Sequence, residues 1–509
     1  MHQELQFRRQ FLIAKVQIEP LNEWRCLKID HYFLYVHPDL EVHQVSGLNN
    51  DMVLIGSLFD PYKPEKRNLS ILREIHSNAN SLEDLFLQIK RYAGRYAVLY
   101  KNNQSAAIFH DALGLMELYY CTKNNQIVCG SQPNLLAEFA NPAIGSTNNP
   151  ELLEFYKRHS KDSKWNPSYK WIGDETYYEG IKHLLPNHYL DITRQEARRY
   201  WPNEPIKKLD LGEAVSDICS FLQGSLQAIA NRHSIMMAVT SGTDSRTLLA
   251  ASRGIQEKVY YFINDHGLGH NHSDIAVPKK IFKGIDLPFH VHDVPKDVDN
   301  EFRRIFQKNT FFASDRLLPT IYNVYYKDHG EKVNIQGTGE IGRTRYGKEP
   351  EKLNGYLLGY KLGYKDDPYA IKEGEKILAE LLPVGRTYGL NVLTLLYWEH
   401  TLGNWGATGN SESDIAIEEL DPYDSHKLFE IFLGVDGRYT KFTNPILFRE
   451  MIRNMWPQLL EWPINPPHTP RDNIKLLIKK LGLYRFAKEI KYQMNYFEYR
   501  YKAKLKRVS

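Results

Sequence analysis

The sequence predicts an α/β protein with two domains, the second of which is built on a parallel sheet. Its 509 residues are too many for one compact core, so a division into domains is expected. Within residues 236–251 an apolar strand, a tight turn and an alanine- and leucine-rich helix follow one another. A second β-rich run, residues 259–263, comes about one helix length later, which is the spacing that a parallel βαβ unit requires.

The first third of the chain is rich in residues that favour strands. Residues 92–100 carry an aromatic and aliphatic stripe that predicts a strand, and a turn at residues 110–114 follows it. Two further short β-rich runs are found at residues 118–120 and 127–131. This region therefore predicts a β-rich first domain.

A cluster of turn-forming residues at 141–150 marks the boundary between the halves. We assign residues 1–150 to the first domain and residues 168–470 to the second. Residues 471–509 form a separate tail, because their composition differs from that of the rest of the chain.

The turn within residues 236–251 has the features of an anion-binding site. Free N–H groups and the positive end of the helix dipole point into such a turn, and small residues let a ligand approach the backbone. An acidic residue in the same turn is placed to hold a cation. The residues expected to bind phosphate are the small or polar residues of this turn: Thr240, Ser241, Gly242, Thr243, Asp244 and Ser245. A helix cap without any ligand has the same composition. The neighbouring segments must therefore decide between an anion-binding turn and a structural cap.

The elements that follow continue the alternation of strand and helix. Residues 273–284 predict a helix and residues 287–294 a third strand, along which His290 and His292 face the same side. Residues 333–342 then repeat the order of strand, glycine-rich turn and acidic residue. That turn contains Gly337, Gly339 and Glu340, and Arg343 follows as a possible partner of a phosphate.

These motifs together resemble the asparagine synthetase-like family. The turn at residues 240–245 is similar to the Ser-Gly-Gly-x-Asp-Ser pyrophosphate loop (PP-loop) of ATP pyrophosphatases, with serine in place of one glycine. Residues 333–342 resemble the family's Ser-Gly-Glu-Gly-x-Asp-Glu segment without its paired acid. Residues 418–430 resemble the Glu-x-Arg-x-Pro-Phe-Leu-Asp segment, and residues 178–191 the hairpin that leads into the synthetase domain.

The N-terminal motifs resemble the glutaminase domain of class II amidotransferases. The resemblance implies an αββα sandwich of the Ntn-hydrolase type, followed by a parallel-sheet domain like the adenine nucleotide α-hydrolases with a helical C-terminal region. A glutaminase of this class needs a cysteine at its mature N-terminus. The chain begins Met1-His2, so we expect a domain without glutaminase activity, as in β-lactam synthetases.

The resemblance implies ATP and Mg²⁺ as cofactors and an AMP-forming ligase as the activity. Asp244, Glu340 and Arg343 are the expected catalytic residues, and Asp244 and Glu340 are the expected metal ligands. A carboxylate of a small molecule or glycan would attack the α-phosphorus of ATP, and ammonia or an amine would then form the amide. Surface-polysaccharide and secondary-metabolite biosynthesis are the expected settings.

Two other function classes stay open. The family's C-terminal loop carries a lysine, but residues 456–467 contain no Lys or Arg, which also fits a catalytically impaired scaffold. A nucleic-acid-modifying ATP pyrophosphatase is the third class. The basic tail favours this third class, and the glutaminase-like domain counts against it.

The tail at residues 471–509 contains twelve Lys or Arg and three Asp or Glu, a net charge of +9 in a chain whose total is +4. Interleaved leucines, isoleucines, tyrosines and phenylalanines predict an amphipathic basic helix. Packing on the second domain is one interpretation. Contact with an anionic membrane surface or acidic partner is the other, with nucleic acid less favoured.

Composition indicates a cytoplasmic protein. Hydrophobic residues make up 42% of the chain, and no apolar run is long enough to span a bilayer. The first ten residues lack the apolar core of a signal peptide, and four irregularly spaced cysteines favour neither disulfides nor structural zinc. His266, His270 and His272 lie in one loop, which is either a substrate-side surface loop or a metal site.

Overall fold

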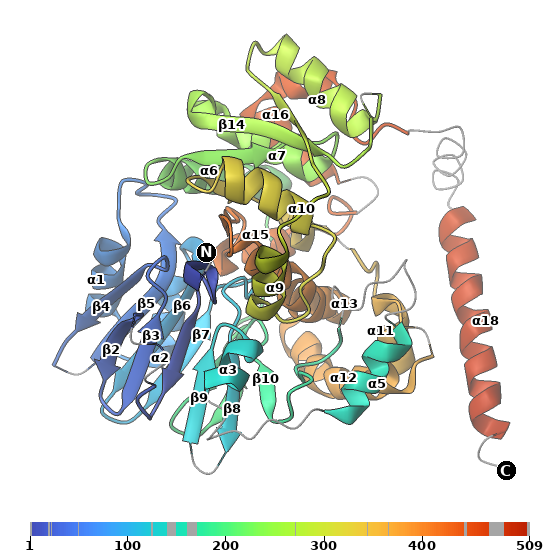
Figure 1. Cartoon of the computed structure of the whole chain (residues 1–509). Helices are drawn as coiled ribbons and strands as arrows, with labels where there is room; N and C mark the ends of the chain where they lie inside the picture. The colour runs from blue at the N-terminus through green and yellow to red at the C-terminus, as the bar shows by residue number, and fades with distance from the viewer. Residues whose placement is uncertain are drawn as a thin grey trace.

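The computed structural model describes residues 3–18, 21, 23–48, 50–123, 126–139, 149–159, 171–269, 271–343, 345–364, 366–441, 445–467 and 483–505. Figure 1 shows a β-rich N-terminal part in blue and cyan, a second part coloured from green to orange, and helix α18 (Leu483–Leu505) at one side of the molecule. No helix within these ranges combines the length and the apolar character that crossing a bilayer requires.

The N-terminal part contains two antiparallel sheets of six strands each. The order in the first sheet is β10 (Ile181–His183), β8 (Tyr119–Lys123), β9 (Gln126–Gly130), β1 (Phe11–Ala14), β3 (Tyr32–Val36) and β2 (Arg25–Ile29). The order in the second sheet is β12 (Glu196–Arg199), β11 (His188–Asp191), β7 (Ala106–His110), β6 (Ala93–Asn102), β5 (Asn50–Phe59) and β4 (Val42–Ser46).

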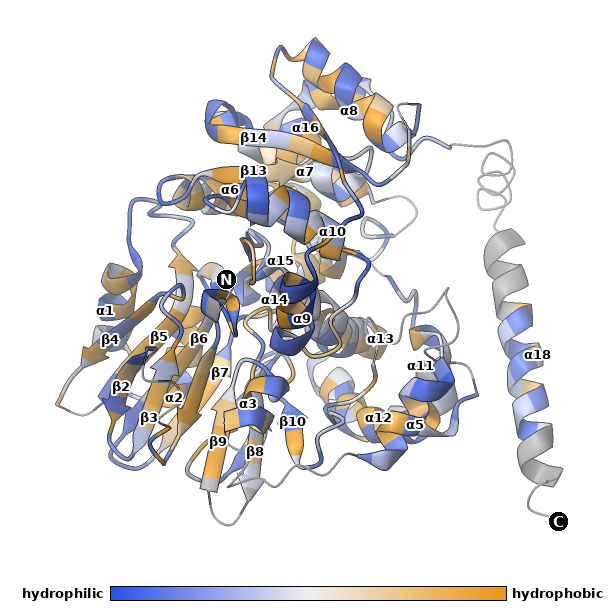
Figure 2. Cartoon of the chain, viewed as in Figure 1, coloured by the Kyte–Doolittle hydropathy of each residue, from blue (hydrophilic) through white to orange (hydrophobic). Residues whose placement is uncertain are grey.

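The two sheets pack face to face, and helices cover their outer faces. In β5, Val53 and Ile55 enter the core between the sheets, whereas Met52 and Leu54 face helices α1 (Asn68–Asn78) and α2 (Leu82–Ile89). Successive strand residues point to opposite faces, so a strand buried on both sides is continuously apolar. Figure 2 shows this hydrophobic colouring across the strands of the sandwich. Helix α3 (Pro133–Phe139) covers the other outer face.

The segment after residue 168 still contributes to these two sheets. Strand β10 pairs with β8, and β11 pairs with β7. Residues 178–191, which the sequence predicted as a hairpin at the start of the second domain, therefore place β10 and β11 in different N-terminal sheets instead of pairing them with each other. Pairing partners that lie 60 or more residues away in the chain leave no local signal in the sequence, which is why the boundary could not be drawn there.

The second part is built on a parallel sheet of five strands. Their order is β15 (His290–Asp293), β14 (Val259–Asp265), β13 (Ile235–Ala238), β16 (Val333–Ile335) and β17 (Glu418–Leu420). The strand expected at residues 259–263 is thus present as β14, and the helix expected at residues 273–284 is α8 (Ser273–Gly284). Strand β15 begins only after Pro288, because proline cannot donate a hydrogen bond to the ladder.

Helices cover both faces of the parallel sheet. Met237 of β13 packs on the side of α6 (Leu211–Ala230), α7 (Thr243–Ala251), α8 and α16 (Ile446–Met455). Met236 packs on the opposite side, among residues of α9 (Asn300–Asn309), α10 (Leu318–Thr320) and the π-helix η5 (Ile321–Tyr326).

A group of helices follows β16 in the chain, some before β17 and one after it. It consists of α11 (Gly355–Leu362), α12 (Pro368–Tyr388), α13 (Val392–Leu396), the π-helix η7 (Tyr397–Gly406), α14 (Ala407–Ser413) and α15 (His426–Gly434). Helix α5 (Pro150–His159) packs against α12. Helices α5, α11, α12 and α13 lie at the lower right of Figure 1, beside the N-terminal sandwich, and α15 lies nearer the centre.

Candidate nucleotide-binding site

The turn predicted to bind phosphate lies at the carboxyl end of the central strand of the parallel sheet. Strand β13 leads through α7 to β14 on one side, while β16 pairs with its other side. The end of β13 is therefore a topological switch point, the place where open parallel sheets bind their ligands.

Helix α7 begins directly after this turn. Its N-cap is Gly242, whose backbone is extended (φ −74°, ψ 165°). Glycine has no side chain that could accept a hydrogen bond from the first turn of the helix. The positive end of the helix dipole therefore faces the turn without a capping side chain from Gly242. The chain thus folds locally as its small residues predict.

Two hydroxyl residues of the turn brace it from within. Thr240 donates its backbone N–H to the Oγ of Ser245 over 3.1 Å, and the two side-chain oxygens lie 3.0 Å apart. The N–H of Gly242 is donated to the Oγ1 of Thr240 over 3.1 Å. The side chains of Thr240 and Ser245 therefore stabilise the turn itself.

Asp274, at the start of α8, reaches into the same turn. Its Oδ1 accepts the backbone N–H of Ser241 over 3.1 Å and the Ser241 hydroxyl over 2.6 Å. The sequence predicted the helix at residues 273–284 but gave Asp274 no role in the turn, because a contact between residues 33 positions apart depends on how the helix packs. A phosphate bound at Ser241 would have to replace this carboxylate.

Asp244 and Arg343, two of the predicted catalytic residues, form an ion pair. The Arg343 Nη2 donates to the Asp244 Oδ2 over 2.5 Å, and the side chains are 6% and 28% exposed. The Arg343 guanidinium also lies over the Phe448 ring, 5.4 Å from its centroid. Asp244, the expected metal ligand, is therefore neutralised by Arg343, the residue that was expected to contact phosphate.

Asp421, which the sequence did not select, holds the turn after β16. It follows β17, and its carboxylate accepts the N–H of Thr338 over 2.8 Å and that of Tyr423 over 2.9 Å. Burial raises the pKa of Asp421 to about 6, and the charge of Asp244 adds to the rise. The only signal in the sequence was the Asp-Pro-Tyr-Asp core of residues 421–424.

The glycines of the second turn have a packing role. A Cβ on Gly337 would lie 2.6 Å from the Cδ1 of Leu248 in α7, and a Cβ on Gly339 would lie 3.0 Å from the Cε1 of Phe448 in α16. Both glycines thus let the turn after β16 approach the helices around the phosphate loop. Glu340 belongs to the short helix η6 (Gly339–Gly342), but its side chain lies outside the described part of the chain, so its metal-binding role stays a prediction.

The segment that lacks the expected lysine lies against the phosphate loop. The N–H of Asn465 is donated to the carbonyl of Ser241 over 2.9 Å. Arg246, fully buried in α7, donates to the carbonyl oxygens of Leu459 (2.8 Å) and Trp462 (3.3 Å). Burial lowers the pKa of Arg246 to about 10, and within the described ranges no carboxylate pairs with it. Arg246 is thus a buried cation beside the loop that the sequence did not indicate.

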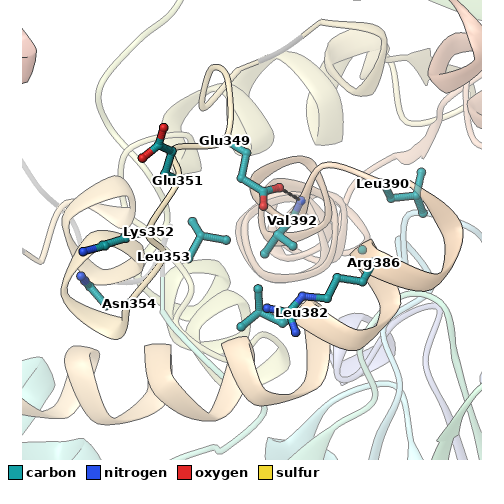
Figure 3. Close-up of a pocket in the computed structure, with 10 residues that line it drawn as sticks. Glu349, Glu351, Lys352, Leu353, Asn354, Leu382, Arg386, Leu390 and Val392 are labelled. Atoms are coloured by element: carbon teal, nitrogen blue, oxygen red, sulfur yellow. Dashed lines mark hydrogen bonds between the residues drawn. The ribbon is translucent and has the colours of Figure 1, made fainter.

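A hollow lies in the helical region, with a volume of about 620 Å³. Figure 3 shows its lining, which combines Leu353, Leu382 and Val392 with the charged Glu349 and Arg386. The Glu349 carboxylate accepts the N–H of Val392 over 2.9 Å, so it caps α13. None of the lining residues belongs to the phosphate loop.

The histidines are engaged in local structure. His272 is the N-cap of α8, where its Nδ1 accepts the N–H of Asp274 over 3.3 Å. His290 and His292 both stack on Tyr260, with ring centroids 4.2 and 5.7 Å away, as their alternation predicts. Over the described ranges no group of three or more His, Cys, Asp or Glu is arranged to hold a metal, and His270 lies outside them.

The chain was compared with known proteins. No family model and no curated protein matches it. Similar solved structures include the allosteric regulatory enzyme of purine biosynthesis, with 11% identity over 60% of this chain and 73% of that chain and a TM-score of 0.25. Another is glutamine phosphoribosylpyrophosphate amidotransferase from B. subtilis in complex with ADP and GMP, with 7% identity over 59% and 65% of the chains and a TM-score of 0.19. Similarity this low carries no argument about fold or function.

Proposed function

We propose that this protein is an ATP-dependent carbon–nitrogen ligase that releases AMP and pyrophosphate. The observation that carries the proposal is the position of the loop at residues 240–245. It joins the central strand of a parallel sheet to a helix N-terminus at the switch point, and a carboxylate and a guanidinium lie beside it.

In this proposal the phosphates of ATP lie over the turn, where the backbone N–H groups of Asp244 and Ser245 and the helix dipole bind them. Oxygen ligands such as the Asp244 carboxylate suit Mg²⁺, which would neutralise phosphate charge. Arg343 would then exchange its bond to Asp244 for a bond to a phosphate oxygen, since a guanidinium binds either anion. The protein's contribution is placement and charge neutralisation.

The reaction we propose has two steps. A substrate carboxylate attacks the α-phosphorus, so that an acyl–adenylate bond forms and the bond to pyrophosphate breaks. Ammonia or an amine then attacks the activated carbonyl carbon; AMP leaves, the nitrogen loses a proton, and an amide remains. A carboxylate on a small molecule or glycan is the proposed substrate.

The first domain is proposed to supply no ammonia from glutamine. Such chemistry needs a reactive thiolate. Burial raises the pKa of Cys129 and of Cys219 to about 12 each, and Cys121 is buried as well. Cys26 is exposed on the edge strand β2. Free ammonia or an amine substrate therefore fits this chain better.

Exchange of labelled pyrophosphate into ATP, measured with pools of carboxylic acids, tests the proposal. Asp244→Asn should lower exchange by about a hundredfold or more, because a charge that stabilises the reacting phosphates is lost. Asp297→Asn, a change at an exposed acid away from the loop, is the matched control and should exchange like the wild-type protein. Equal exchange in both variants would contradict the assignment of the loop.

A catalytically impaired scaffold is the second candidate. The Asp244–Arg343 ion pair and the carboxylate of Asp274 on Ser241 favour it, because both engage groups that ATP and Mg²⁺ need. Calorimetric titration with ATP and Mg²⁺ separates the two candidates. A scaffold predicts neither nucleotide binding nor exchange in the wild-type protein, whereas a ligase predicts both.

A further inference from the structure

Helix α18 packs against the rest of the protein through a face of tyrosines. The Tyr356 ring of α11 lies 5.9, 5.2 and 4.9 Å from the rings of Tyr492, Tyr496 and Tyr499. The Asn354 Nδ2 also donates to the Tyr496 hydroxyl over 3.4 Å. In Figure 1, α18 stands beside α11 at the edge of the molecule, with nothing drawn on its far side. The tyrosine face therefore fixes which side of α18 turns outward.

The outward side of α18 carries an apolar stripe. Ile490, Met494, Phe497 and Tyr501 are 44%, 68%, 73% and 58% exposed. Their spacing of four, three and four residues places them on one face of a helix. The other exposed large apolar residues of the described chain are scattered singly: Val16, Leu48, Tyr62, Leu87 and Leu268. We call the four residues on α18 the apolar stripe.

Positive charge flanks the apolar stripe. Lys491 and Arg500 are exposed on α18, and residues 471–509 carry twelve Lys or Arg against three Asp or Glu. Arg500 lies over the Tyr496 ring, 5.8 Å from its centroid. An apolar stripe with basic flanks is the composition of helices that lie in the plane of an anionic membrane surface.

We infer that α18 docks this protein on a membrane that contains anionic lipid. The apolar stripe enters the boundary between headgroups and acyl chains, and the basic flanks bind the phosphate and carboxylate groups of the lipids. The tyrosine face stays on α11, so the rest of the chain is held at the surface. This inference does not rest on the proposed ligase activity.

Two other occupants fit the helix less well. A second copy of α18 would bring two segments of +9 charge together, and like charges repel. A nucleic acid could stack its bases on the exposed rings of Phe497 and Tyr501, but three other tyrosines of α18 are already packed on Tyr356. Ile490 and Met494 would add nothing to contacts with a phosphate backbone. An anionic lipid surface uses both the charge and the apolar stripe.

Co-sedimentation of the full chain with vesicles tests the inference. Vesicles of phosphatidylcholine alone are compared with vesicles that also contain phosphatidylserine, at low and high salt. The double variant M494Q/F497Q replaces the two central residues of the apolar stripe with glutamine, a polar residue that favours helices. Its binding to the anionic vesicles should fall by about tenfold or more, while M494L/F497L binds like the wild-type protein.

The matched control L48Q/L87Q removes a similar exposed apolar area elsewhere and should leave vesicle binding unchanged. Circular dichroism confirms that each variant is folded. Equal sedimentation of the wild-type protein and M494Q/F497Q, or none of the wild-type protein, would overturn the inference. A dimer of the wild-type protein that the M494Q/F497Q substitutions dissociate, as measured by sedimentation equilibrium, would also overturn the inference. Binding of polyuridylate that the M494Q/F497Q variant retains would overturn it as well.

Discussion

At the scale of single residues, the turn at residues 240–245 is held by one ion pair and by hydrogen bonds to a carboxylate. Asp244 is paired with Arg343, and Ser241 is held by Asp274. A buried charge is costly unless it is paired, so these contacts stabilise the site when no ligand is bound. The same contacts must open for phosphate to enter. In the proposed function, exchange of the Arg343 bond from Asp244 to a phosphate oxygen would be the step on which nucleotide binding depends.

Arg343→Ala should weaken ATP binding by about tenfold or more, because a guanidinium contributes strongly to phosphate binding. Arg343→Lys keeps the charge without the planar fork and should give an intermediate affinity. Calorimetric titration with ATP and Mg²⁺ measures both. Arg438→Ala, at an arginine that is 67% exposed, is the control. Equal affinity of the wild-type protein and Arg343→Ala would contradict a phosphate-binding role.

At the scale of elements, helix α6 joins the two halves of the molecule. It packs on α16 within the second part, and its Gly224 lies against the loop after β5 of the first. A Cβ on Gly224 would lie 1.9 Å from the carbonyl oxygen of Pro61, an atom of the backbone that cannot easily move. Tyr62 and Phe221 also meet edge to face, with centroids 6.1 Å apart. A glycine here permits the close approach of the helix and the sandwich.

Gly224→Ala should lower the free energy of unfolding by about 1–3 kcal/mol, the usual cost of overpacking. Gly409 provides a matched control, since it also lies inside a helix, α14, and a Cβ there would meet nothing within 4 Å. Gly409→Ala should stabilise the protein by up to about 1 kcal/mol through helix propensity. Urea denaturation measures both values. A Gly224→Ala protein as stable as Gly409→Ala would contradict the close approach.

At the scale of the whole molecule, the two halves meet through buried polar groups. Arg95 of β6 forms two bonds of 2.6 Å with Asp414, which follows α14. The carboxylate of Glu117 accepts the hydroxyl of Ser411 over 2.5 Å. Burial raises the pKa of Glu117 to about 7 and that of Glu412 to about 8. The contact between the halves therefore contains carboxyl groups that hold protons near neutral pH.

This protonation makes stability depend on pH. A carboxyl whose pKa rises from 4.5 to about 8 on folding binds more protons in the folded state, so stability is full below about pH 4.5 and falls as pH rises toward 8. Glu412→Gln imitates the protonated acid and should flatten that fall. Thermal melting from pH 5 to 8 measures this change in stability, and Glu257→Gln, a substitution at an exposed position, is the control. An unchanged pH dependence in Glu412→Gln would contradict the assignment.

Local signals in the sequence were enough for individual elements. The apolar run and small residues of 236–251 predicted β13, the turn and α7, and the helix at 273–284 was predicted with its observed bounds. Periodicity, caps and turn residues act within a few positions of one another, so they can be read directly from the chain. The expectation that Asp244 and Arg343 belong to one site came instead from the family resemblance, because no local signal connects residues so far apart in the chain.

Only the tertiary structure decided how these elements and residues are combined. Asp244 and Arg343 are 99 positions apart, yet the order of the parallel strands makes them an ion pair. It also brings Asp421 and Arg246 to the site and places β10 and β11 in the N-terminal sheets. Contacts between distant residues depend on sheet order and helix packing, which leave no periodic trace in the sequence. The amino-acid order therefore determined the local chemistry of the turn at residues 240–245, and packing determined which charges surround it.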